Sequence, residues 1–192
     1  MLTFTLDTNC IIDLAEPETR PSASYIRQLA NAHAAGLADV AFVAVSASER
    51  QQGDTYLDSY AVFQQRLDAL GLSHVTLIRA IGYYDISYWE MCLSGDENMV
   101  AREKEIHDVL FPNIEFLWSS YAHSHGILED DFKSPKAKRW RNTFCDRQMY
   151  WAHDQNKRHF FVTSDANFRK LVSHQKFPAA RVVSPMEAVG LL

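Results

Sequence analysis

Short apolar runs along this chain alternate with longer stretches in which apolar residues recur at helical spacing. The run at 40–45 is continuous and rich in valine, which is typical of a strand buried on both faces of a sheet. Residues 2–6 and 160–163 form two similar runs. The shorter runs at 74–78 and 181–183 are further strand candidates.

The stretches between these runs predict helices. Pro21 suits the first turn of a helix, and Gly36 suits the position just after its end. We expect helices over residues 8–14, 21–35, most of 47–71 with a break near Gly53, 97–110, 137–156 and 166–174, and a last one from Pro185.

This alternation predicts an α/β fold, a three-layer α/β/α sandwich around a central, mainly parallel sheet of four to five strands. The 192 residues, 47% of them hydrophobic, allow a single domain, residues 1–192, with a real core. Residues from about 80 to 140 are aromatic and contain several loop signals, and we expect them to form a mainly helical elaboration of that domain.

Acidic residues follow three of the predicted strands. Asp7, Glu49 and Asp165 each lie just past an apolar run, while Asp146 lies in the helix predicted over 137–156. Because the carboxyl ends of parallel strands meet at one edge of a sheet, these side chains are expected to share a site. Clustered carboxylates repel one another unless a cation compensates them, and Mg²⁺ or Mn²⁺ prefers such oxygen ligands.

Each acid also has a local explanation. Asp7 and Asn9 are both good helix N-caps, and Asp165 could cap the helix that follows it. Glu49 could complete a capping box with Ser46. Asp146 could be an ordinary exposed helical acid. Capping does not require three acids to converge on one sheet edge, so the shared site is the preferred interpretation.

Five stretches of the chain carry motifs, namely FTLDTN at 4–9, VSASER at 45–50, Asp146 with Trp151-Ala152 after it, FVTSDANF at 161–168, and VSPMEA at 183–188. In this order they resemble the motifs of the PIN-domain nucleases, a family of metal-dependent ribonucleases that includes the VapC-type toxins. Together they cover residues 2–50 and 142–192. Each motif is weak by itself, and their order and spacing make the resemblance specific.

The resemblance implies an endoribonuclease that leaves a 5′-phosphate and a 3′-hydroxyl. It implies that Asp7, Glu49, Asp146 and Asp165 are the catalytic residues and bind Mg²⁺ or Mn²⁺. It also implies that Asn9, Thr163 and Ser164 hydrogen-bond the acids or the scissile phosphate. An antitoxin or another inhibitor protein and a second copy of the chain are candidate partners beside the RNA substrate.

The chain departs from compact, toxin-type members of that family in its longer and more aromatic middle. That departure leaves open whether the protein is the toxin of a toxin–antitoxin pair or a stand-alone enzyme. It also leaves Asp130, Asp131 and Asp154 as alternatives to Asp146, which we prefer for its predicted position early in the helix and its distance from Asp165.

A cationic segment precedes Asp146. Phosphate contacts and aromatic stacking from this segment would suit single-stranded RNA, and a solvated helix start is the alternative. Arg50 and Arg147, which each follow a proposed ligand, could neutralise a phosphate or form surface ion pairs. The candidate substrate-binding residues are Arg50, Lys136, Lys138, Arg139, Trp140, Arg141 and Arg147.

Charge and cysteine usage narrow the class of protein. The net charge of −5 excludes a protein that holds long nucleic acid through phosphate contacts alone. Three widely spaced cysteines favour a reducing, cytoplasmic location over a disulfide framework. The chain shows neither a membrane-spanning run nor a signal peptide, so a cytoplasmic location without membrane contact is expected.

Two other functions compete with the nuclease. A PIN-like scaffold could bind RNA or protein without catalysis, although a scaffold has no reason to keep like charges together. A phosphotransfer domain could use an aspartyl phosphate. The acidic pair or second aspartate that such domains require is not present in this sequence.

Overall fold

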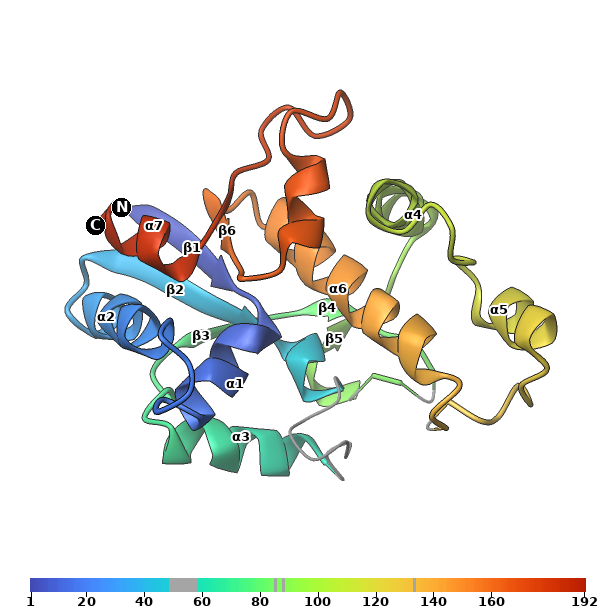
Figure 1. Ribbon diagram of the computed structural model, residues 1–192, viewed down its shortest axis with the longest axis horizontal. Helices are drawn as coiled ribbons and strands as arrows, with labels where there is room; N and C mark the ends of the chain where they lie inside the picture. Colours follow the sequence, from blue (N-terminus) through green and yellow to red (C-terminus); the bar gives the residue numbers. More distant parts are fainter. Residues whose placement is uncertain (49–58, 85, 88, 133) are drawn as a thin grey trace.

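Five parallel strands form the central sheet of the computed structural model, which describes residues 1–48, 59–84, 86–87, 89–132 and 134–192 (Figure 1). Their order is β3-β2-β1-β6-β7. The strands are β1 (Leu2–Leu6), β2 (Ala38–Val43), β3 (Thr76–Ile78), β6 (Phe160–Val162) and β7 (Val182–Val183). Leu6 pairs with Phe42 on one side and Val162 on the other, so three strands end at the same level.

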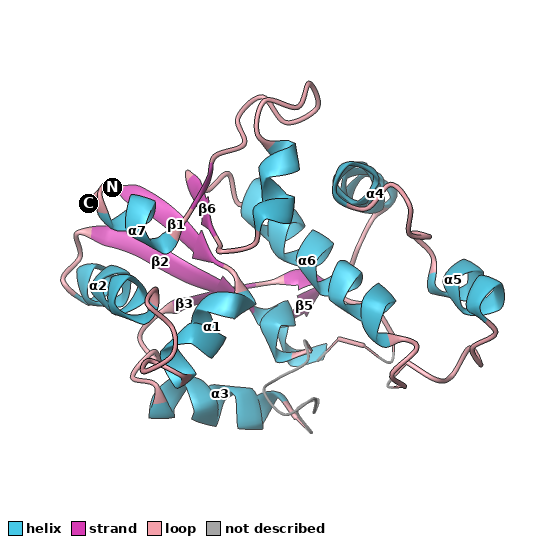
Figure 2. Cartoon of the chain, viewed as in Figure 1, coloured by secondary structure: helices cyan, strands magenta, loops and turns pink. Residues whose placement is uncertain are grey.

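Side chains alternate between the two faces of this sheet, as strand geometry requires. Phe4, Leu6 and Phe42 face one core, and Val43 and Phe161 face the other. The first face is covered by α1 (Thr8–Ala15), α2 (Ala23–Ala34), α3 (Tyr60–Ala69) and α7 (Pro185–Val189). The second is covered by α6 (Lys138–Gln155). The predicted three-layer α/β/α architecture with a parallel sheet is confirmed, and Figure 2 shows strands and helices in separate colours.

The local predictions hold for most of these elements and differ in two places that matter for the site. The valine-rich run leaves the sheet after Val43 and continues as a 3-10 turn, η1 (Ala44–Ala47). The helix expected over 166–174 is a 3-10 helix, η3 (Ala166–Leu171). Tight 3-10 turns directly after strands keep the residues at the carboxyl edge close to it.

The middle of the chain contributes α4 (Glu97–Leu110) and α5 (Trp118–His125), which lie beyond α6 in Figure 1. It also holds η2 (Trp89–Met91) and a small second sheet of β4 (Ala80–Ile81) and β5 (Cys92–Leu93). Neither α5 nor this small sheet was predicted, because their segments are too short for a clear periodicity. The assignment of residues 80–140 as an elaboration of one domain stays a prediction.

Helix α4 packs on α6 through a buried charge network. The Arg147 Nε–H donates to Glu103 Oε1 at 2.6 Å, and both side chains are at most 1% exposed. Tyr83 donates its hydroxyl hydrogen to the second oxygen of Glu103. Arg147 also lies over the ring of Phe116, 4.3 Å from its centroid. The network fixes α4, and the loop that follows it, against α6.

No helix in the part of the chain that the structure describes is both long and apolar enough to cross a membrane.

Candidate functional site

Asp7 lies where β1 ends and α1 begins. Its backbone N–H donates to Val162 O at 3.0 Å, which extends the β1–β6 pairing by one residue. Asp7 occupies the N-cap position of α1, but its side chain makes no capping hydrogen bond. Instead, its Oδ2 accepts hydrogen bonds from the Thr163 hydroxyl at 2.5 Å and from Asn9 Nδ2 at 2.7 Å. The side-chain hydrogen bonds of Asp7 therefore join the end of β1 to the end of β6 and to the first turn of α1.

Thr163 is the centre of this hydrogen-bond network. Its hydroxyl donates to Asp7 and accepts from Asn9 Nδ2 at 3.0 Å and from the Asp165 backbone N–H at 2.9 Å. One donor and two acceptors are the full capacity of a hydroxyl group. Asp7 is thus held in a single orientation by residues from the ends of β1 and β6.

The pKa of Asp7 is raised from 3.8 to about 6, chiefly by burial and to a smaller extent by the negative charge of Asp165, while hydrogen bonds from the Thr163 hydroxyl and from the backbone of Thr8 and Asn9 act to lower it. The Asp7 side chain is almost completely enclosed, with 4% of the residue exposed. A buried carboxylate beside a second carboxylate is the electrostatic situation that a cation relieves. The structure therefore brings Asp7 and Asp165 into one acidic site.

Asp165 has two roles in the structure. Its Oδ1 accepts the Asn167 backbone N–H at 2.8 Å, so it caps η3, as its local explanation proposed. Asp165 is exposed, and its charge still acts on Asp7. Ser164, between Thr163 and Asp165 in the chain, is also exposed. Capping and membership of the acidic site are compatible, because the cap involves one carboxylate oxygen.

Glu49 and Arg50 lie outside the described residues, and so does the proposed capping box of Ser46 with Glu49. The residues just before Glu49, in η1, are held by contacts that the sequence did not indicate. The Thr8 hydroxyl donates to Ser46 Oγ at 2.7 Å and contacts the sulfur of Met149 at 3.2 Å. These buried contacts join the start of α1, η1 and α6 next to the acidic edge.

Asp146 lies in the middle of α6 rather than early in the helix, and it is half-buried. Its spacing places it on one helix face with Arg139, Asn142 and Thr143, and these four residues line one cavity. Asp154, one of the alternatives to Asp146, forms an ion pair with Arg102 at 2.8 Å near the other end of α6. Of these two acids, Asp146 is the one placed toward the acidic edge.

Among the described residues, which leave out Glu49, no three His, Cys, Asp or Glu side chains form a group that could hold a metal ion. The convergence of all four acids therefore remains a prediction. The donors present at the edge still fit a hard cation, since Asp7 and Asp165 offer carboxylate oxygens and share an unfavourable charge.

Three of the predicted RNA contacts are wrong, because the side chains are interior. Trp140 is 3% exposed, donates its Nε1–H to Glu115 O and stacks on Phe144. Arg147 is 1% exposed and paired with Glu103, so it is neither a phosphate ligand nor part of a surface ion pair.

The third is Arg141, which is 5% exposed and donates to the backbone oxygen of Ser48 at 3.0 Å. It therefore anchors the end of η1 to α6. Lys136 and Arg139 are exposed and Lys138 is half-buried, so a role for these three at the surface stays a prediction. The alternation of buried and exposed cations follows the two faces of α6.

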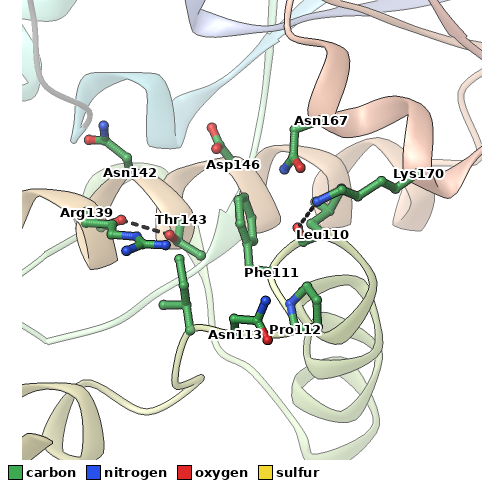
Figure 3. Close-up of a pocket in the computed structure, with 11 residues that line it drawn as sticks. Leu110, Phe111, Pro112, Asn113, Arg139, Asn142, Thr143, Asp146, Asn167 and Lys170 are labelled. Atoms are coloured by element: carbon green, nitrogen blue, oxygen red, sulfur yellow. Dashed lines mark hydrogen bonds between the residues drawn. The ribbon is translucent and has the colours of Figure 1, made fainter.

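A cavity of about 410 Å³ adjoins Asp146, between α6, η3 and the connection from α4 to α5. Figure 3 shows Phe111 and Asn113 from that connection on one side of α6, with Asn167 and Lys170 of η3 beside them. No role was predicted for any of these four residues, although Asn167 lies inside the FVTSDANF stretch. The helical spacing of Arg139, Asn142 and Asp146 was the one signal that could have indicated a common polar face.

The sequence matches no protein-family profile and no curated protein. Among solved structures the fold is similar to a chain in the crystal structure of VapBC2 from Rickettsia felis bound to a DNA fragment from their promoter. That similarity has a TM-score of 0.44 at 12% identity and covers 95% of this chain and 98% of the other.

Proposed function

We propose that this protein is a metal-dependent endoribonuclease that hydrolyses phosphodiester bonds at the carboxyl edge of its sheet. The observation that supports this most is the buried Asp7, held by Thr163 and Asn9 beside Asp165. A buried carboxylate with a raised pKa beside a second carboxylate is typical of a functional site.

Asp7 and Asp165, together with Asp146 and Glu49, would hold Mg²⁺ or Mn²⁺. When bound, the ion would polarise the scissile phosphate and lower the pKa of a coordinated water. The chain itself would orient Asp7 through Thr163 and Asn9, so that no side chain has to be reorganised on binding. The exposed Arg139 and Lys170 would offset phosphate charge beside Asp146.

The partners expected from the sequence remain proposals. An inhibitor protein could place a basic side chain among the acids and thereby take the place of the cation. The antitoxin of a toxin–antitoxin pair would be one such inhibitor protein. A homodimer is a further proposed assembly.

The deciding experiment compares RNA cleavage by the wild-type protein and by Asp165→Asn, each with Mn²⁺ and with EDTA. We expect Mn²⁺-dependent cleavage that falls at least about tenfold in the variant, the order seen when groups around a metal are lost. Asp96→Asn is the matched control, because exposed Asp96 also caps a helix by accepting Met99 N–H at 2.8 Å.

Equal cleavage by both variants and the wild-type protein would refute the proposal. A scaffold without catalysis predicts no cleavage and no Mn²⁺ binding that depends on Asp7, which calorimetry would measure.

A further inference from the structure

A second cavity lies at the amino edge of the sheet, on the side opposite to the acidic site. It has a volume of about 280 Å³ and lies between the end of α6 and the residues that lead into β6 and β7. Small-molecule sites begin at about 300 Å³, so this cavity suits a small ligand or a single chemical group. Its basic lining residues are His153, Lys157, Arg158, His159 and Arg181.

Part of the charge in this lining is already neutralised by neighbouring groups. Asp154, the acidic residue of the lining, accepts hydrogen bonds from Arg102 Nε at 2.8 Å and Nη2 at 3.3 Å, so both of its oxygens are engaged. Arg158 is paired with Asp39 at 2.8 Å. Burial lowers the pKa of His153 from 6.5 to about 3, so its imidazole is neutral. The remaining basic residues of the lining are the ones that a ligand would meet.

Lys157 and Arg181 are exposed and have no carboxylate partner in the part of the chain that the structure describes. The Arg181 guanidinium lies over the ring of Phe160, 5.7 Å from its centroid. His159 Nδ1 accepts the Thr3 N–H at 3.2 Å, so a neutral His159 ring carries its proton on Nε2 and can donate from there. Two like charges at one cavity repel each other, and an anion between them would relieve that repulsion.

Basic residues just past a helix often interact with its last carbonyl groups, which is the ordinary explanation for Lys157. Here the backbone already satisfies those groups. The carbonyl oxygens of Ala152, His153 and Asp154 accept the backbone N–H groups of Asn156, Arg158 and Lys157, in that order, at 3.2, 3.3 and 2.9 Å. Lys157 also has a φ of 50°, in the left-handed region that glycine adopts at lower cost. The end of α6 therefore does not require the Lys157 side chain.

We propose that this cavity binds a phosphate group. Phosphate presents acceptor oxygens on several sides, which suits a lysine ammonium, an arginine fork and an imidazole N–H that come from separate segments. The whole chain carries a net charge of −5, so affinity for phosphate has to come from such a local concentration of cations. The group belongs either to a small phosphate compound or to an RNA backbone. The site goes beyond the proposed nuclease function and does not depend on it.

Calorimetric titration with inorganic phosphate, in EDTA and at an ionic strength held constant with chloride, measures this site. Lys157→Gln combined with Arg181→Gln should weaken phosphate binding by at least about tenfold, because it removes two charge-assisted contacts. Arg20→Gln combined with Lys104→Gln is the matched control. It changes the net charge equally, and neither exposed residue lines the cavity.

Lys157→Gly separates binding from folding. Glycine adopts a φ of 50° more readily than lysine, so this variant should unfold at a temperature no lower than that of the wild-type protein. It should nevertheless bind phosphate more weakly, because the ammonium group is lost. Thermal unfolding of every variant, without phosphate, confirms that each one is folded.

A labelled single-stranded RNA without terminal phosphates, followed by anisotropy in EDTA, separates the two sources of the group. Binding of inorganic phosphate that depends on Lys157 and Arg181 supports the site for a small phosphate compound. The same dependence seen with RNA alone supports the site for a phosphodiester of the RNA backbone. If neither ligand binds, or if the folded cavity variants bind both as the wild-type protein does, the proposal is overturned.

Discussion

The Asp7→Asn variant is expected to lose RNA cleavage by at least about a hundredfold while becoming more stable than the metal-free wild-type protein. The two effects have one cause, the burial of a charged carboxylate. Thr163 and Asn9 donate to one oxygen of Asp7, and an asparagine oxygen can accept the same two hydrogen bonds. The substitution thus removes the charge and keeps the packing.

The size and pH dependence of this stabilisation follow from the pKa of Asp7, which rises from 3.8 to about 6 on folding. That rise makes the charged form about 3 kcal/mol less favourable in the folded protein. Below pH 3.8 both states are protonated and no penalty arises. As the pH increases through about 6 the folded protein loses the proton, and the full penalty is present above that pH.

Urea unfolding of both proteins in EDTA, from acidic to neutral pH, checks this result. The stability of the variant relative to wild type should increase by about 1–3 kcal/mol between pH 4 and pH 7. Mn²⁺ should then stabilise the wild-type protein at pH 7 more than the variant, because it binds the folded carboxylates. A variant that is less stable at neutral pH, or that cleaves RNA normally, would contradict the assignment of Asp7.

The second large effect is expected at the buried pair between α4 and α6. Arg147→Met should destabilise the protein by about 3–5 kcal/mol, because it leaves the Glu103 carboxylate buried without its cation. The loss includes the hydrogen bond from Arg147 Nη1 to Phe116 O at 3.1 Å. His107 beside it cannot substitute as a cation, since burial lowers its pKa.

A double-mutant cycle isolates the pair. Arg147→Met combined with Glu103→Met should recover most of the lost stability in urea unfolding, because no charge then remains buried. Lys104→Met is the surface control. It breaks an exposed pair with Asp108 and should change the free energy of unfolding by less than about 1 kcal/mol. Equal losses of stability for Arg147→Met and Lys104→Met would show that the buried pair contributes no more to the free energy of unfolding than the exposed pair does.

The same pair fixes one wall of the cavity beside Asp146. Helix α4 leads directly into the wall formed by Leu110, Phe111 and Ile114, and the Glu103–Arg147 contact holds that helix on α6. Arg147, which the sequence suggested as a phosphate ligand, is therefore a positioning residue in the structure. Its exposed neighbour on α6, Arg139, keeps the role at the surface.

Local sequence patterns predicted the strands and the acids at their ends. Strand burial leaves a period of two or a continuous apolar run, and both signals are contained in a few neighbouring residues. Asp7 and Asp165 could be placed at one sheet edge because parallel strands end there together. The local sequence could not distinguish a helix cap from a shared acidic site, because both explanations require an acidic residue at the same position.

The sequence by itself determined the α/β architecture, the order of the strands along the chain and the acidic character of one edge. Only the tertiary structure decided which charges are buried. Arg147 meets Glu103 across 44 positions of the chain, and no local pattern encodes that pairing. The cavity beside Asp146 likewise needs α6, η3 and the α4–α5 connection to meet, because the groups that line it come from separate segments. Local periodicity indicates which face of its own helix or strand a residue occupies. Tertiary packing determines which residues of other elements contact that face.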